Sequence, residues 1–376
     1  MRFTGTWTTS PQPLDDSAFE NLTLRMMARG SIAGKRARVR FSNAHGVEPV
    51  TIADASIALR RGETGIEFSS RRALTFGGEA RATIAAGALA LSDPVEIDLP
   101  ALADIAITFH VPGPVARSTG HGSARQTNYF SPPGNHAAAA DMPIGRAIDS
   151  WFFATGVEVE TSVATRGIVT LGDSLTDANV STPNANCRWP DQLARRLVAA
   201  RGPHFAGVMN QGIGGNRILR DNPNAYSGLR RFDRDVIAQP GATHLIVLLG
   251  TNDLRNRRGD PAEEATAPGL IAGLKQMAAR AKAADLKAYV GTLMPYENET
   301  FVPGCWTPER EKVRLAVNAW IRGNDAFDAV IDFEKALQDP VNPSKLLPKW
   351  DCGDHLHPSD AGYTHMGDAI DLALFD

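Results

Sequence analysis

The chain has 376 residues, more than one ordinary hydrophobic core accommodates, so we expect two domains. Apolar residues make up 43% and charged residues 22% of the sequence, which is typical of a soluble globular protein. The formal net charge of −3, with acidic and basic residues mixed along the chain, argues against nucleic acid or an anionic membrane as a partner.

The sequence shows no targeting or membrane-spanning segment. No apolar run is long enough to cross a bilayer, and residues 1–7 lack the apolar core of a secretory signal. We therefore expect a cytoplasmic protein, or a secreted or periplasmic one whose leader has been removed. The one dense basic stretch, Arg255–Arg258, is too short for a nucleic-acid tail and is interpreted as a solvated loop.

The three cysteines lie far apart and lack the spacing of a zinc finger or of a disulfide framework. They are Cys187, Cys305 and Cys352. A single disulfide between Cys305 and Cys352 stays open as a hypothesis, since both are expected in loops near the site proposed below.

Residues 1–163 have the texture of strands. Alternating or β-branched runs recur about every ten residues and are separated by Gly, Pro, Asn and Asp. This pattern predicts a β-sandwich, of jelly-roll type, that serves as a structural companion or as a carbohydrate-binding or site-shaping module. The polar stretch Thr119–Thr127, with His121, is expected to form a loop and could line a pocket. The expected strands are Leu22–Met26, Ala37–Phe41, Ala55–Leu59, Ala82–Ile84, Val95–Leu99 and Ile105–Val111.

Residues 164–376 alternate between short apolar runs and amphipathic segments, which predicts βαβ units and a parallel sheet. We expect a three-layer α/β domain of flavodoxin-like type, which binds ligands at the carboxyl ends of its strands. The expected strands are Ile168–Leu171, Ala206–Met209, His244–Leu249, Ala288–Leu293 and Ala329–Phe333. Helices are expected from Pro190, after Ser227, over Leu270–Ala278, from Pro308, and after Ser359, the last burying Met366, Ile370 and Leu374.

Four polar loops follow these strands or precede the last helix. They are Gly172–Leu175, Asn210–Asn216, Gly250–Asp253 and Asp351–Pro358. Because the carboxyl ends of parallel strands meet at one edge of a sheet, we expect the loops to converge. Acyl transfer needs a nucleophile, a base, a group that orients the base, and donors for an oxyanion, and the four loops contain all of these.

Each role has a candidate. Ser174 is expected at the turn from strand to helix, where backbone N–H groups favour negative charge, and is the candidate nucleophile. His357 is the candidate base, and Asp354, three residues earlier, can orient its ring. The backbone N–H groups of Ser174 and Gly215, with the side-chain amide of Asn252, can form the oxyanion hole. Asp173 and Asp253 are expected to hold the loop backbones by local hydrogen bonds.

Two other interpretations were weighed. The last loop carries carboxylate, thiolate and imidazole ligands that could bind a metal: Asp351, Cys352, Asp354, His355 and His357. No second group of ligands completes a coordination shell, so we expect no metal and no cofactor. The glycines after Asn210 lack the spacing of a phosphate-binding loop.

The four loops resemble those of the SGNH hydrolases, also called GDSL-type esterases and lipases. Ser174, Gly215, Asn252 and His357 match the four family blocks in order, and the resemblance covers roughly residues 166–376. It implies that Ser174 and His357 are catalytic. The β-rich front half looks like the extra N-terminal domain of a bacterial branch that contains esterases and carbohydrate deacetylases.

We therefore expect a serine esterase that works through an acyl-enzyme on short-chain esters, such as acetyl esters, of small molecules or carbohydrates. An acyltransferase with the same acyl-enzyme and a non-catalytic carbohydrate-binding protein are the alternatives. The loop Pro295–Trp306 could wall the pocket, and its Glu297 and Glu299 are expected to disfavour anionic leaving groups.

Overall fold

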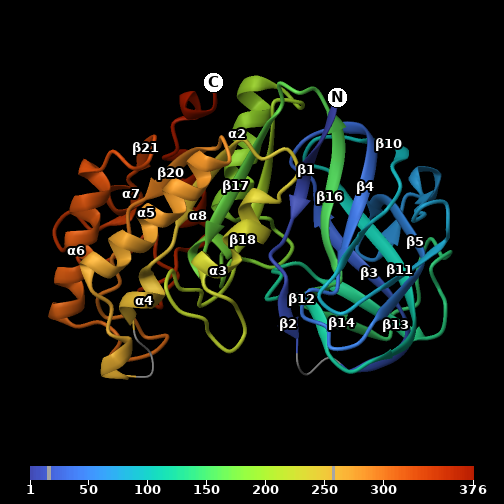
Figure 1. Ribbon diagram of the computed structural model, residues 1–376, viewed down its shortest axis with the longest axis horizontal. Coiled ribbons are helices and arrows are strands. Elements are labelled where there is room, and N and C mark those ends of the chain that lie inside the picture. The colour runs from blue at the N-terminus through green and yellow to red at the C-terminus, as the bar shows by residue number, and fades with distance from the viewer. Residues whose placement is uncertain (15–17, 256–258) are drawn as a thin grey trace. The chain divides into compact units, whose positions relative to one another are not determined.

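Figure 1 shows the computed structural model, which describes residues 1–14, 18–255 and 259–376. Two compact units divide the chain. The first consists of Met1–Thr165, Pro183–Asn186 and Leu197–Val208, and the second of Arg166–Thr182, Cys187–Arg196 and Met209–Asp376. In the described part of the chain, no helix is both long enough and apolar enough to cross a membrane.

The first unit is built from antiparallel sheets around an apolar core. Strand β11 (Asp104–Val115) lies between β3 (Phe19–Arg29) and β5 (Val50–Arg61), and its alternate side chains Ile105, Ile107 and Phe109 are buried in that core. One sheet contains β1 (Arg2–Thr8), β16 (Ala154–Thr161), β4 (Gly34–Ser42), β10 (Val95–Leu99) and β9 (Leu89–Leu91). Another contains β14 (Arg146–Ile148), β13 (Asn128–Pro133), β3 (Phe19–Arg29), β11 (Asp104–Val115), β5 (Val50–Arg61), β6 (Gly65–Ile66), β7 (Arg72–Ala73) and β8 (Arg81–Ile84). A third contains β15 (Ser150–Phe152), β12 (Ser118–Gly122) and β2 (Gln12–Leu14).

All six strands expected in this region lie within observed strands. Several other strands of this unit lack the apolar alternation that predicts a strand, among them β12, which contains no large apolar side chain. His121 belongs to this strand and is buried, with its Nδ1 2.9 Å from the carbonyl oxygen of Ser10. The expectation that the polar stretch forms a loop is therefore wrong for its first residues.

The second unit is organised around a parallel sheet with strand order β18-β17-β19-β20-β21. Val169 and Leu171 belong to one apolar cluster with residues of the helices α5 (Ala267–Ala283) and α6 (Pro308–Gly323), while Ile168, which points to the other face, is equally buried outside that cluster. Both faces of the sheet are thus covered, as a parallel sheet requires. The strands are β17 (Arg166–Gly172), β18 (Ala206–Gly212), β19 (His244–Leu248), β20 (Lys287–Gly291) and β21 (Ala329–Ile331).

Helices follow the strands in sequence. Pro at the first turn and Thr caps begin α5 and α6, and Ser359 caps α8. The helices are α1 (Ser174–Asp177), α2 (Trp189–Arg201), α3 (Gly228–Phe232), α4 (Thr251–Arg255), α5 (Ala267–Ala283), α6 (Pro308–Gly323), α7 (Phe333–Leu337) and α8 (Asp360–Asp368). A π-helical turn, Asp233–Ile237, continues α3.

Several element ends differ from expectation, and two strands are shorter than expected, since β19 ends at Leu248 instead of Leu249 and β20 at Gly291 instead of Leu293. Strand β21 stops at Ile331 because the carboxylate of Asp332 accepts a hydrogen bond from the backbone N–H of Lys335 and caps α7, so Phe333 is helical. Helix α8 ends at Asp368, and a separate 3₁₀ turn, Leu372–Phe375, follows it. This turn buries Phe375 and leaves Leu374 half-buried, so the expectation that Leu374 belongs to the last helix is wrong.

Two loop predictions are also corrected. Arg255 is the last residue of α4 and is fully buried, because its charge is paired with Glu299; residues 256–258 lie outside the described residues. The interpretation of Arg255 as part of a solvated loop is therefore wrong. Cys305 and Cys352 are both free thiols, one buried and one exposed, so the hypothesis of a disulfide between them is contradicted.

Close backbone packing below the serine gives a testable prediction. A Cβ on Gly212 would lie 2.4 Å from the backbone nitrogen of Asp177, so Gly212→Ala must push α1 away from β18. We expect a loss of about 1–3 kcal/mol in unfolding free energy, together with displacement of Ser174, the first residue of α1.

The matched control is Gly323→Ala in the last turn of α6. Nothing lies within 4 Å of a Cβ there, so chemical denaturation should show unchanged stability or a gain of about 0.4–1 kcal/mol. Equal stability of the two variants would contradict the packing at Gly212.

Candidate active site

Ser174 lies at the sharp turn between β17 and α1. The side chain of Asp173 caps α1 by accepting a hydrogen bond from the backbone N–H of Leu175 at 2.9 Å. Gly172 permits this turn, because a Cβ there would lie 2.0 Å from the hydroxyl oxygen of Thr176. The sequence thus places the Ser174 hydroxyl at the carboxyl end of the strand and at the start of the helix.

His357 joins this serine to a carboxylate. Its Nε2 lies 3.0 Å from the Ser174 hydroxyl oxygen, and its Nδ1 lies 2.7 Å from a carboxylate oxygen of Asp354. An ionised carboxylate only accepts hydrogen bonds, so Nδ1 carries the proton and Nε2 is left to accept one from the serine. The histidine ring is almost fully buried.

The carboxylate of Asp354 is held in its charged form. Burial alone raises its pKa, but hydrogen bonds from the His357 ring and from the backbone N–H groups of His357 and Leu356 outweigh it. The net effect holds the pKa of Asp354 well below its usual range. A negative charge therefore faces the imidazole even at acidic pH values at which an ordinary aspartate is protonated.

The two other candidate residues lie on neighbouring loops. Gly215 has φ = +75°, a conformation that favours glycine, and its carbonyl oxygen accepts a hydrogen bond from the Asn222 side chain at 3.0 Å. The Asn252 side-chain nitrogen lies 3.2 Å from the Asp173 carboxylate and 3.2 Å from the carbonyl oxygen of Asn216. Asn252 thus contacts both the loop before Ser174 and the loop after Gly215.

The local roles expected for Asp173 and Asp253 are confirmed. Besides capping α1, Asp173 accepts from Asn252, while Asp253 accepts from the backbone N–H groups of Ile218 and Leu219 at 2.7 and 3.1 Å. Burial raises the pKa of Asp253 to about 6 in spite of these two bonds. Burial of this carboxylate costs free energy, but its two hydrogen bonds anchor the loop that follows Gly215.

Sequence inspection missed Arg231, whose guanidinium is fully buried beneath these loops. It donates to the carbonyl oxygens of Gly172 and Gln211 at 2.9 and 2.8 Å and to the side-chain oxygen of Asn216 at 3.1 Å. Asp235, one helical turn later, balances its charge at 3.0 Å. Arg231 thereby ties the ends of β17 and β18 to the glycine loop. The only sign of this role in the sequence is the spacing of Arg231 and Asp235, four residues apart. The same spacing is found in exposed ion pairs on helix surfaces, so it does not indicate burial.

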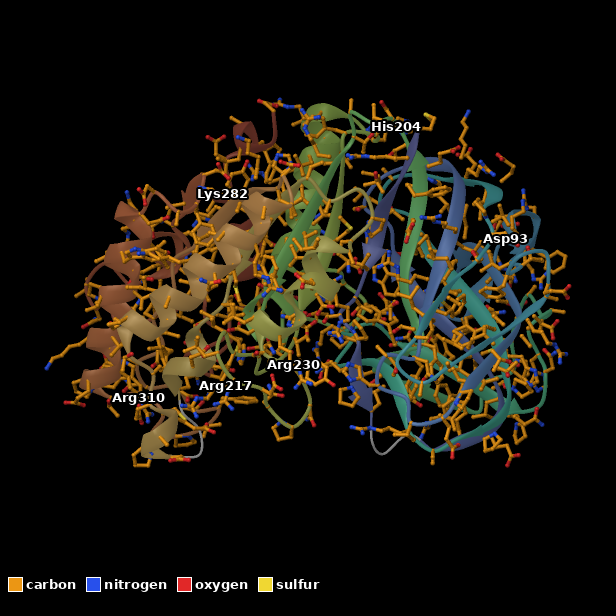
Figure 2. The ribbon with its side chains drawn as sticks, in the orientation of Figure 1. Asp93, His204, Arg217, Arg230, Lys282 and Arg310 are labelled. Carbon is orange, nitrogen blue, oxygen red and sulfur yellow. The ribbon has the colours of Figure 1, made fainter. Side chains whose placement is uncertain are left out.

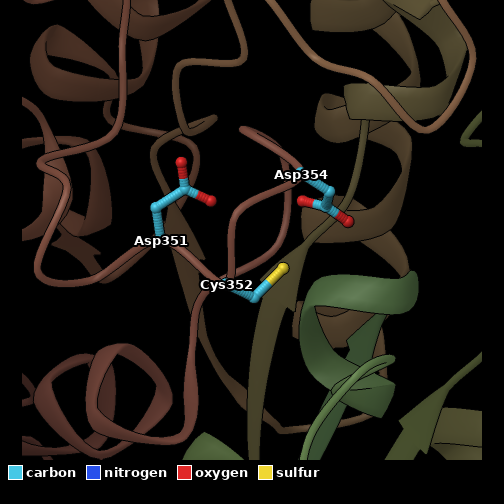
Figure 3. Close-up of side chains that lie close together, drawn as sticks. All are labelled: Asp351, Cys352 and Asp354. Carbon is cyan, nitrogen blue, oxygen red and sulfur yellow. The ribbon is translucent and has the colours of Figure 1, made fainter.

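The remaining candidates of the last loop have structural partners. Figure 3 shows Asp351, Cys352 and Asp354, whose possible ligand atoms lie within 4.8 Å of one another. The carboxylate of Asp351 lies 2.5 Å from Nδ1 of His355, and that of Asp354 contacts His357. Burial raises the pKa of the Cys352 thiol to about 11, so the thiol is neutral near neutral pH. Both carboxylates are thus engaged with histidines, and the expectation of no metal stays a prediction.

The loop between β20 and α6 also reaches the histidine. The phenyl ring of Phe301 meets the His357 ring edge-on with centroids 5.5 Å apart, and half of its surface is exposed. Glu299 does not present a charge to a ligand as expected, since it is buried and neutralised by Arg255. The predicted effect of Glu299 on anionic leaving groups is therefore wrong.

A cavity of about 210 Å³ opens beside Gly215 and Asn252. Arg217, labelled in Figure 2, lines it and pairs with Glu263 at 2.7 Å. Glu263 lines the cavity as well, and the other lining residues are Gly214, Asn222, Pro223 and Asn224. Polar side chains and backbone thus dominate the walls.

Comparison with known proteins identifies the family. The sequence model of the GDSL-like lipase/acylhydrolase family matches residues 170–365, slightly more than half of the chain. The chain therefore belongs to this family and is a carboxylic ester hydrolase. No curated protein matches it.

Several solved structures are similar to part of the chain. A putative lipolytic protein of the G-D-S-L family from Desulfitobacterium hafniense is 21% identical, covers 55% of this chain and 97% of its own, and has a TM-score of 0.41. An acetylxylan esterase from Geobacillus stearothermophilus is 18% identical, with coverage of 57% and 96% and a TM-score of 0.42. A putative arylesterase from Agrobacterium tumefaciens is 19% identical, with coverage of 55% and 96% and a TM-score of 0.40.

The lowered pKa of Asp354 predicts a stability that depends on pH. Because the pKa is lower in the folded protein than in the unfolded chain, where it is about 4, the contribution of Asp354 is present above that pH and is lost as the pH falls through the folded value. The wild type should therefore exceed Asp354→Asn in unfolding free energy near about pH 6, and the difference should shrink below about pH 4. Urea denaturation at several pH values measures this, and a difference that stays constant would contradict it.

Proposed function

We propose that the protein is a serine esterase in which Ser174, His357 and Asp354 act as nucleophile, base and orienting carboxylate. The observation that carries this proposal is the hydrogen-bonded series from the Ser174 hydroxyl through His357 to Asp354, at 3.0 and 2.7 Å. An imidazole with a serine hydroxyl on one side and an ionised carboxylate on the other is the arrangement that activates the hydroxyl for acyl transfer.

The reaction proceeds in two halves. His357 Nε2 takes the proton of Ser174 as the hydroxyl oxygen bonds to the ester carbon, and the imidazolium then gives that proton to the alkoxide of the leaving alcohol as the ester C–O bond breaks. Water loses a proton to His357 and attacks the acyl-enzyme, and the same proton returns to Ser174 when the carboxylic acid leaves. Asp354 stabilises the imidazolium in both halves and stays ionised.

The oxyanion is assigned to three donors, the backbone N–H groups of Ser174 and Gly215 and the side-chain amide of Asn252. Two observations support this assignment: the left-handed backbone of Gly215 and the placement of Asn252 between the Asp173 and Asn216 loops. These donors are held by protein contacts before a substrate binds, so little reorganisation is needed when charge develops.

Residues 164–376 are proposed as the catalytic domain, and residues 1–163 as an accessory β-sandwich of jelly-roll type. The antiparallel sheets and the continuous apolar core of the first unit support that architecture.

The substrate is proposed to be an ester with a short acyl group, such as acetyl, on a small alcohol or carbohydrate. The cavity beside Gly215 and Asn252 supports this choice, because about 210 Å³ lined mainly by polar groups offers little apolar contact to a long chain. The half-exposed ring of Phe301 lies beside His357, which protonates the leaving oxygen, and so offers an apolar face to the alcohol or sugar.

Removal of the nucleophile tests the proposal. Ser174→Ala should lower kcat for a p-nitrophenyl acetate substrate by at least about 10³-fold, and Asn252→Ala, which removes one oxyanion donor, by about 10²- to 10³-fold. Circular dichroism should show both variants folded. Wild-type turnover by folded Ser174→Ala would overturn the assignment of the nucleophile.

Acyl-chain length tests the substrate class. With p-nitrophenol as the common leaving group, kcat/KM should fall by roughly tenfold or more from the acetyl to the octanoyl ester, because the longer chain leaves the cavity. Analysis of the products in added alcohol should give the free acid as the main product. Preference for the octanoyl ester would contradict the short-chain proposal, and transfer to the alcohol as the main reaction would make the protein an acyltransferase.

A further inference from the structure

A buried ion pair lies next to the candidate oxyanion residue Asn252. Arg255 donates to one carboxylate oxygen of Glu299 from Nη2 at 2.8 Å and from Nε at 3.2 Å, and neither side chain is exposed to solvent. Removing two charges from water costs about as much as their attraction returns, so such a pair is weak evidence for a role in stability alone.

The third contact of Arg255 is with Asn252 itself. Nη1 of Arg255 lies 3.2 Å from the side-chain oxygen Oδ1 of Asn252. The two ends of an asparagine amide have nearly the same shape, so shape alone does not decide which end faces the substrate. A guanidinium carries only hydrogen-bond donors. It can therefore pair with the acceptor Oδ1 but not with the NH₂ group, which is also a donor. Arg255 thereby turns Nδ2 toward the side of the amide where Asp173 and Asn216 lie.

This orientation matters most when charge develops. In the resting structure Nδ2 is shared between Asp173 and the Asn216 carbonyl, both at 3.2 Å. An oxyanion must draw one of these N–H groups away, and the contact at Oδ1 keeps the amide in place while this happens. A donor at Oδ1 also polarises the amide, which makes its N–H groups stronger donors.

Glu299 extends the same network to the histidine. Its second carboxylate oxygen accepts from the backbone N–H of Val302 at 3.0 Å. Thr300 and Phe301 lie between Glu299 and Val302 in the sequence. The N–H of Thr300 donates to the carbonyl oxygen of Asp354 at 2.9 Å, and the ring of Phe301 contacts the His357 ring. One carboxylate therefore anchors both the arginine behind Asn252 and the loop beside the catalytic histidine.

We propose that Arg255, held by Glu299, is a positioning residue that fixes the amide of Asn252 for oxyanion stabilisation. This inference rests on the proposed function. The buried pair is thus proposed to raise the rate of the chemical step, and to do so by positioning Asn252.

A double-mutant cycle tests the proposal. Arg255→Met combined with Glu299→Gln removes both charges and leaves an oxygen at residue 299 for the Val302 N–H, so no unpaired charge stays buried. The kcat and KM of p-nitrophenyl acetate hydrolysis are measured for this double substitution in the wild-type protein and in Asn252→Ala. In the wild-type background we expect kcat to fall by about tenfold or more, with KM changed by less than about threefold. In the Asn252→Ala background the same double substitution should lower kcat by less than about twofold.

A second variant and a control complete the design. Arg255→Lys keeps a positive charge opposite Glu299 but loses the fork that reaches Asn252, and its effect should likewise vanish in Asn252→Ala. Arg314→Met is the matched control, since Arg314 is a buried arginine that is paired with Glu311 and Glu334 and donates to the carbonyl oxygen of Leu293. Its effect on kcat, whatever the size, should be the same in both backgrounds.

Two results would overturn the proposal. An equal loss of kcat in the presence and absence of Asn252 would show that the pair acts through the fold, and an unchanged kcat in folded Arg255 variants would show that it does not act on catalysis. Failure of the proposed function is recognised separately, because Ser174→Ala would then retain activity.

Discussion

The buried guanidinium of Arg231 is the interaction on which the geometry of the site depends most. It binds the last carbonyl of β17, the carbonyl of Gln211 near the end of β18, and the side chain of Asn216. Ser174 follows the first of these points by two residues, and Gly215 precedes the last by one. A single rigid fork therefore sets the spacing between the serine turn and the glycine loop, and Asp235 makes its burial tolerable.

The second unit uses buried polar contacts throughout the site. Asp173, Asp253 and Arg255 each connect their own loop or helix to another loop of the site. Such contacts are directional, so they fix angles that apolar packing leaves free. The apolar core below the loops holds the sheet and helices together, while the charged residues above it place the donors and acceptors of the reaction.

Much of this architecture could be predicted from the sequence. Runs such as Ile168–Leu171 and the helical face from Leu270 to Ala278 follow periods that burial enforces, and the order of the strands then brings four polar loops to one edge. The loop motifs predicted Ser174, Gly215, Asn252 and His357 as site residues, because each proposed role requires a particular residue type at a particular turn. Strand ends were less predictable, as at Phe333, because a cap at Asp332 overrode an apolar run.

The buried arginines could not be predicted in this way. Arg255 occurs in a basic stretch and has the composition of a solvated loop, yet its partner Glu299 lies 44 residues away and only the fold brings the two together. Arg231 is likewise explained by backbone carbonyls, which carry no sequence signal. The Cys305–Cys352 pairing was wrong as well, because both thiols are free.

Covalent labelling tests the central claim most directly. A fluorophosphonate reacts with an activated serine hydroxyl and leaves a stable adduct that peptide mass spectrometry can locate. We predict one adduct per chain, on Ser174, with loss of esterase activity in proportion to labelling and no adduct in His357→Ala. Full inactivation with Ser174 unmodified, or undiminished activity with Ser174 fully labelled, would contradict the account.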